Sequence, residues 1–252
     1  MTTLTPTEHA LKDAFIRARG YWRPWTEALL KLNPAFLSLY ARYAGHAAEQ
    51  GPLSPRMCEL IYVALDGSAT HLFRSGLKLH MQLALERGAT AHEIVEVLQI
   101  ATAQGLDGCL AGASILVEEL AAGGKDTHFL VAPLTREQQR LRAAYKDRFG
   151  DWPDACEHLL RLDPAYFEQV LHLLADARPD EGLSDKERAL IALALNACFT
   201  ALNPDGVRLN IRRALRLGAT RGEMLQVLQM TAHLGVHACA LGLPDLMGLI
   251  EK

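Results

Sequence analysis

The 252-residue chain has no cysteine pair in CxxC spacing, no excess of charge of one sign and no long uninterrupted apolar run. Its five cysteines are scattered, so we expect free buried thiols in a reducing cytoplasm rather than disulfides or a zinc knuckle. A formal net charge of −3 is unlike the basic excess typical of nucleic-acid-binding proteins. The apolar runs fall short of the roughly 18 residues of a membrane span, and the N-terminus lacks a signal-peptide pattern. These absences predict a cytoplasmic protein with no nucleic-acid or membrane partner.

The sequence instead contains an internal repeat, in which one pattern returns 130 residues later without a gap. The clearest matches are LLKLNPAF with LLRLDPAY, at 29–36 and 159–166, and ALERGATAHEIVEVLQ with ALRLGATRGEMLQVLQ, at 84–99 and 214–229. A single register over so many positions indicates a tandem duplication. We place the first domain at 1–125 and the second at 126–252, with the join in the small-residue stretch 121–135.

Each half carries the signals of helices and none of strands. Ser54 precedes a proline, as at many helix starts, and Ser184 is followed three residues later by Glu187, which predicts a capping box. Thr90 and Glu93 repeat that capping signature directly after a glycine-containing turn. Apolar residues between these caps recur at helical spacing, and no segment alternates as a strand would. The sequence therefore predicts an all-α protein.

The order of motifs in the first half is ELIYVAL at 59–65, a polar turn, LHMQLALERGAT at 79–90 and HEIVEVLQIA at 92–101. This order resembles the carboxymuconolactone decarboxylase family, which also contains the alkylhydroperoxidase D-like proteins. The resemblance implies an AhpD-like fold built twice, with a degenerate second copy. It also implies a homo-oligomer, which for a fused pair of domains would be a trimer of two-domain chains.

Peroxidase-type members of that family place a CxxC pair shortly before a histidine that corresponds to His80. The two cysteine positions hold Phe73 and Gly76 in this chain. Thiol redox chemistry needs a thiolate and a resolving thiol, so a peroxidase-like oxidoreductase is the least favoured function. Cys58 is the only thiol near the expected site.

The resemblance then implies the decarboxylase branch, which uses no metal and no organic cofactor. Its substrate class is a small carboxylated lactone from aromatic-acid breakdown, such as 4-carboxymuconolactone. Loss of CO₂ leaves a carbanion that an acid must reprotonate, and a remaining carboxylate needs a cation. We predict that His80, His71 and Glu59 are catalytic and that Arg74 and Thr70 bind the substrate. The segment between Glu59 and His80 is two residues longer than in the peroxidase-type members, so a contact between these two side chains stays an open question.

The second half lacks these groups and carries others. His80, His71, Glu59 and Arg74 correspond to Asn210, Ala201, Ala189 and Pro204. His233 and His237 occur only in the second half, at the i, i+4 spacing of one helical face. Without a third ligand in the sequence we predict no metal site. We propose instead that the halves pack as a pseudo-dimer in which His237 completes the substrate site.

Three further expectations follow from the same patterns. Loss of the site in one half allows the alternative that the whole protein is a non-catalytic binding or assembly protein. Glu96 is expected on a solvated helix face. Cys109 and Cys239 occupy matching positions in the two halves, which predicts a small buried contact in each.

Overall fold

Helices are the only regular secondary structure in the residues that the computed structural model describes, which are 4–125, 127–176 and 181–250. The first half contains α1 (Pro6–Arg19), α2 (Pro24–Leu32), α3 (Pro34–Gln50), α4 (Pro55–Gly67), α5 (Arg74–Glu86), α6 (Ala91–Thr102) and α7 (Gly105–Ala122). The second half contains α8 (His128–Val131), α9 (Arg136–Phe149), α10 (Asp154–Leu162), α11 (Pro164–Ala175), α12 (Asp185–Ala197), α13 (Pro204–Arg216), α14 (Arg221–Thr231), the 3₁₀ turn η1 (Ala232–Val236) and α15 (His237–Ile250). The all-α prediction is confirmed.

The predicted helix starts are present. The Ser54 hydroxyl accepts a hydrogen bond from the Met57 N–H at the beginning of α4. Capping boxes form at Ser184 and at Thr90, where the carboxylate of the glutamate three residues on accepts a hydrogen bond from the backbone N–H of the cap residue. Each such box satisfies amides that the first turn of a helix leaves without a partner.

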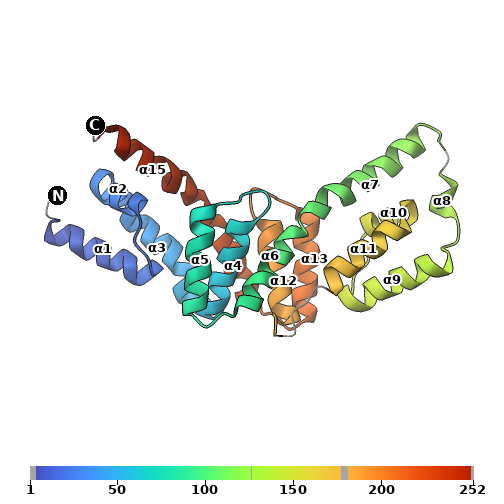
Figure 1. Cartoon of the computed structure of the whole chain (residues 1–252), viewed down its shortest axis with the longest axis horizontal. Helices are drawn as coiled ribbons and strands as arrows, with labels where there is room; N and C mark the ends of the chain where they lie inside the picture. The colour runs from blue at the N-terminus through green and yellow to red at the C-terminus, as the bar shows by residue number, and fades with distance from the viewer. Residues whose placement is uncertain (1–3, 126, 177–180, 251–252) are drawn as a thin grey trace.

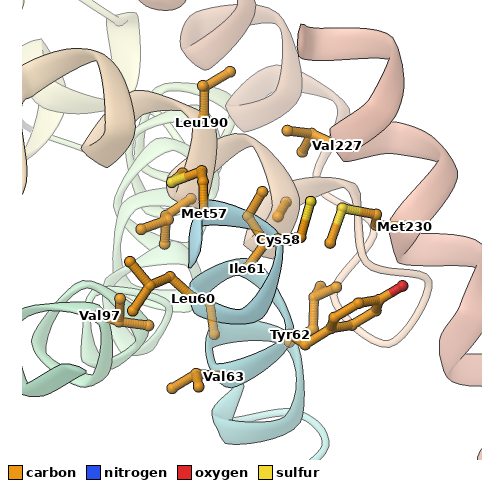
Figure 2. Close-up of a cluster of buried hydrophobic side chains, with 14 of the residues drawn as sticks. Met57, Cys58, Leu60, Ile61, Tyr62, Val63, Val97, Leu190, Val227 and Met230 are labelled. Carbon is orange, nitrogen blue, oxygen red and sulfur yellow. The ribbon is translucent and has the colours of Figure 1, made fainter. Parts of the chain in front are cut away.

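The centre of the molecule is a contact between the equivalent helices α4 and α12 (Figure 1). One hydrophobic cluster joins Met57, Leu60 and Ile61 of α4 to residues of the second half, among them Leu190 and Val227. Figure 2 shows these side chains meeting around α4. The two halves therefore share this central core cluster, in the arrangement of a pseudo-symmetric dimer.

The two halves also exchange their last helices. Helix α7 of the first half packs on α10 of the second, and α15 of the second half packs on α2 of the first. Figure 1 shows the two resulting lobes at opposite ends of the molecule. The division into 1–125 and 126–252 remains a prediction about the repeat, because packing crosses that boundary at each end.

A pair of equivalent polar contacts also crosses between the halves. The Leu183 N–H donates to Glu96 Oε2 at 2.5 Å, and in the matching place the Leu53 N–H donates to Gln226 Oε1 at 2.8 Å. Glu96 is 1% exposed and forms an ion pair with Arg188. The expectation of a solvated Glu96 is therefore wrong, because this face of α6 is turned toward the second half.

The cysteines differ in part from expectation. All five are free thiols, as predicted, and Cys58, Cys156 and Cys198 are buried. Cys109, however, is exposed, and Cys239 is only partly buried. The predicted matching buried contacts are therefore wrong, because α7 and α15 each lie along the other half with one face left open.

Two long segments of the chain are apolar on average. Ala91–Ala122, which covers α6 and α7, and Arg221–Ile250, which covers α14 to α15, are long and apolar enough on average to cross a membrane. Length and composition alone also fit helices that pack within a protein. Since α7 lies on α10 and α15 on α2, both segments have helical neighbours in the structure.

Replacement of Glu96 by glutamine tests the buried ion pair. Glutamine can still accept from Leu183 but leaves the Arg188 guanidinium without its counter-charge, which typically costs about 3–5 kcal/mol for a buried pair. We expect the midpoint of urea unfolding to fall accordingly. The double variant Glu96→Gln/Arg188→Cys copies the equivalent contact of Gln226 with Cys58, so it should recover most of the loss. An unchanged midpoint in the single variant would contradict the assignment.

A second prediction concerns His233, whose Nδ1 lies 2.6 Å from the Tyr62 hydroxyl across the boundary between the halves. Burial, together with the charge of Arg19, lowers the pKa of His233 to about 3. In the unfolded chain the pKa of His233 is near 6.5, so as the pH falls this imidazole is protonated in the unfolded state before it is protonated in the folded state. The stability present above pH ~6.5 is lost toward pH ~3, at about 1.4 kcal/mol per pH unit.

The variant His233→Gln keeps a hydrogen-bonding partner for Tyr62 and removes this titration. Comparison of urea midpoints at two pH values, near neutrality and about two units lower, should show a smaller drop in the variant than in the parent protein. Equal drops would mean that His233 does not carry the proton linkage.

Candidate active site

A cavity of about 330 Å³ lies where the two halves meet, between the start of α2, helix α5 and the start of α15. Its wall includes Arg23, Trp25, Gly76 and His80 from the first half and His237 from the second. Because α15 is the exchanged helix, neither half could form this cavity by itself.

His80 is held in this wall by a chain of charged partners. Its Nδ1 lies 2.6 Å from Glu59 Oε2, and Arg87 donates to the other oxygen of the same carboxylate. Contact with a carboxylate assigns the proton to Nδ1, so Nε2 is left as the free nitrogen. Burial is the largest influence on His80 and lowers its pKa, which makes the imidazole neutral in the free protein.

Aromatic rings fix the orientation of His80. Tyr62 stacks on the imidazole with ring centroids 4.6 Å apart and 27° between the planes, and Tyr21 approaches it edge-on at 6.5 Å. The Tyr62 hydroxyl is in turn held by His233. The position of His80 is thus set on two sides by packing and on a third by Glu59.

His71 is positioned by the turn between α4 and α5. The Ser68 carbonyl accepts hydrogen bonds from the N–H groups of both His71 and Leu72, and the Phe73 N–H donates to the Asp66 carbonyl. This tight path places Leu72 at a φ of 49°, in the left-handed region that side chains other than glycine seldom adopt. These backbone bonds hold the turn together with side-chain bonds, since the Ser68 hydroxyl and the Ala69 N–H both donate to Gln104 Oε1.

His71 meets His237 across the boundary between the halves. His71 Nε2 lies 2.7 Å from His237 Nδ1, and the two rings are nearly parallel with centroids 4.9 Å apart. Phe73 stacks on the same His237 ring at 3.9 Å. Burial, followed by the nearby His71 and His80, lowers the pKa of His237 to about 3, so this imidazole is neutral.

Asp66 lies between the two cavity histidines and was missed by the sequence reasoning. Its Oδ2 is 3.9 Å from His80 Nε2, and its Oδ1 is 3.6 Å from His237 Nε2. Burial raises its pKa to about 8, with a further contribution from Glu59, so the carboxyl group is protonated at neutral pH. A polar residue on an otherwise apolar helix, matched by Asn196 in the second half, is the signal that could have revealed it.

The structure brings together four of the six predicted site residues. His80 contacts Glu59, which settles the question left open by the two extra residues between them, and His71 contacts His237. Only His80 and His237 of the six line the cavity.

The two predicted substrate-binding residues of the turn lie elsewhere. Thr70 forms hydrogen bonds of 2.9 Å with Ser68 and with Thr200. Arg74 is exposed at the start of α5 and does not line the cavity. The guanidinium in the wall is that of Arg23, which donates to the Ser75 carbonyl at 3.1 Å.

Comparison with known proteins identifies a family in the first half of the chain and a similar structure over nearly its whole length. The family model "Carboxymuconolactone decarboxylase family" matches residues 34–118, which include Glu59 and His80 but nothing of the second half. No curated protein sequence matches the chain. A crystal structure from Burkholderia xenovorans, of a candidate gamma-carboxymuconolactone decarboxylase subunit, is 31% identical with a TM-score of 0.91, over 98% of this chain and 99% of that one. The chain belongs to the carboxymuconolactone decarboxylase family.

Proposed function

We propose that this protein is a decarboxylase that removes CO₂ from a small carboxylated lactone of the 4-carboxymuconolactone type and needs no organic cofactor. The observation that carries the proposal is His80, which lies in the cavity wall with its imidazole held by the Glu59 carboxylate. The family, and the similar protein from Burkholderia xenovorans, support the same reaction class.

In the proposed reaction, the bond between the ring carbon and the carboxylate breaks and its electrons pass into the unsaturated lactone. CO₂ leaves, and His80 delivers a proton to the carbanion. The free imidazole is neutral because burial lowers its pKa, but an anionic substrate beside it favours the charged form. Glu59 and Arg87 then hold the imidazolium in place, as an orienting partner does for a catalytic histidine.

A carboxylate that stays on the product needs a cation in the cavity. Arg23 lies in the wall and is partly buried, and its planar guanidinium can bind a carboxylate through two bonds. We therefore assign to Arg23 the role that the sequence suggested for Arg74. His237, which also lines the cavity, would pack against the lactone ring.

Peroxidase chemistry has little support in this structure. Burial raises the pKa of the Cys58 thiol to about 11, whereas redox-active thiols have lowered values. The alternative of a non-catalytic binding protein draws on the second half, where the fold persists although Asn210 and Ala201 replace the two histidines.

The proposal extends to the setting of the enzyme. We expect a trimer of two-domain chains in the cytoplasm, with no nucleic-acid or membrane partner. Apolar side chains on the open faces of the exchanged helices, including Ile115 and Leu116 of α7 and Leu241 and Leu249 of α15, support further association between chains.

Turnover of 4-carboxymuconolactone, followed by the loss of its ultraviolet absorbance, tests the reaction. We expect His80→Ala to lower kcat by about 10²–10⁴-fold, the range typical of a lost general acid. Asn210→Ala alters the equivalent position of the second half and is the matched control, with kcat unchanged. If the parent protein binds the lactone without turnover, the binding alternative replaces the proposal.

The substrate-binding assignment has its own test. Arg23→Ala should raise KM by about tenfold or more, as expected when a charge-assisted contact to a carboxylate is lost. Arg74→Ala should change KM by less than about twofold, because an exposed charge contributes little. The reverse order of effects would return the role to Arg74. If His237→Ala leaves both KM and kcat unaltered, His237 does not contribute to the substrate site.

A further inference from the structure

We propose that Asp66, His71 and His237 form a binding site for one divalent transition-metal ion such as Zn²⁺, built across the boundary between the two halves. One donor atom from each of the three side chains lies within 4.8 Å of the other two. The inference does not depend on the proposed reaction, and it revises the expectation from the sequence that the protein has no metal site.

The donor set suits such an ion. Two imidazole nitrogens and one carboxylate oxygen are common ligands of zinc and of other first-row divalent metals, with one or more positions left for water or substrate. An imidazole binds a given ion through one nitrogen, so His237 would use either Nδ1, which lies 2.7 Å from His71 Nε2, or Nε2, which lies 3.6 Å from Asp66 Oδ1. Ligands around a tetrahedral zinc ion stand roughly 3.3–3.5 Å apart, so the histidine rings would rotate to bring all three donors onto one ion, in place of the hydrogen bond between His71 and His237.

An independent observation at Asp66 also points to a ligand. The residue is 1% exposed, and among the described residues its Oδ2 has no hydrogen-bond partner. A buried carboxyl oxygen without a partner is costly, and a cation that binds in exchange for the carboxyl proton removes that cost.

The carboxylate of Asp66 packs closely against α5 at Gly76, a residue of the cavity wall. A Cβ atom at Gly76 would lie 2.2 Å from Oδ2, so only a glycine allows the carboxylate to reach this position. His80, whose Nε2 lies 3.9 Å from the same oxygen, also belongs to the cavity wall. An ion here would therefore adjoin the cavity and would be accessible to an anionic ligand within it.

The internal repeat provides a built-in comparison. The positions equivalent to Asp66, His71 and His237 are Asn196, Ala201 and Asp107, which retain one ionisable ligand of three. The stoichiometry should accordingly be one ion per chain. The site was hidden in the sequence because its two histidines lie 166 residues apart and come from different halves.

The experiment is titration of the full-length, chelator-treated protein with Zn²⁺ by calorimetry and with Co²⁺ by visible absorption. We expect one equivalent to bind, with Co²⁺ bands of a four- or five-coordinate site. Asp66→Asn copies the residue of the second half and should preserve the fold, and it should weaken binding by at least tenfold. His71→Ala changes a partly exposed turn and should do the same.

The matched control is His172→Ala. His172 lies on the surface of α11, with Nδ1 2.5 Å from Asp176 Oδ2, and so forms a histidine–carboxylate pair outside the proposed site. Its loss should leave the single equivalent unchanged. The proposal is overturned if the parent protein takes up no stoichiometric metal, or if uptake survives both Asp66→Asn and His71→Ala, or if it depends on His172.

Thermal unfolding gives a second readout that needs no substrate. An ion that binds only the folded protein raises its melting temperature, so Zn²⁺ should raise that of the parent and of His172→Ala but not that of Asp66→Asn. If the parent protein binds the metal ion but does not turn over 4-carboxymuconolactone, only the proposed reaction is contradicted. If it turns over the lactone but binds no metal ion, only the proposed metal site is contradicted.

Discussion

The burial of α4 against its counterpart α12 is the contact on which the rest of the molecule depends. Every residue from Met57 to Asp66 is buried, so α4 is enclosed on all sides by its own half and by the other. A helix in this position can carry ionisable residues only if each has a specific partner or a specific chemical role. Glu59 and Asp66 are those residues, and both face the histidines of the candidate site. The core and the site are thus formed by the same helix.

Fusion of the two copies has let them diverge while their packing stays equivalent. At one crossing between the halves a buried carboxylate meets Arg188, and at the equivalent crossing a neutral Gln226 meets Cys58. Each accepts a hydrogen bond from an equivalent backbone N–H of the other half, that of Leu183 for Glu96 and that of Leu53 for Gln226. Charge has therefore been gained or lost at a position where the hydrogen bond has remained. The candidate site shows the same asymmetry, because only one of its two equivalent locations retains the ionisable groups.

Much of this fold could be predicted from the sequence, because its determinants are local. The caps at Ser54, Thr90 and Ser184 depend on residues three positions apart, and the repeat is visible at a fixed shift. Glu96 was misplaced because its burial depends on a partner helix that helical periodicity within α6 cannot reveal. Arg74 was chosen for its place in the turn, whereas the cavity takes its guanidinium from Arg23, more than fifty positions earlier. A shared site containing His71 and His237 was predicted only because each half has histidines that the other lacks. The contact between the two rings could not be predicted, since it requires the exchange of α15.

That exchange makes each copy depend on the other. The second copy has Asn210 and Ala201 where the first has His80 and His71. It is nevertheless needed, because its last helix covers the apolar face of α2 and supplies a wall of the cavity. A chain that ended after the first copy would expose Trp25 and Leu29 to water and would open the cavity to solvent. The second copy thus serves as a structural component of its neighbour.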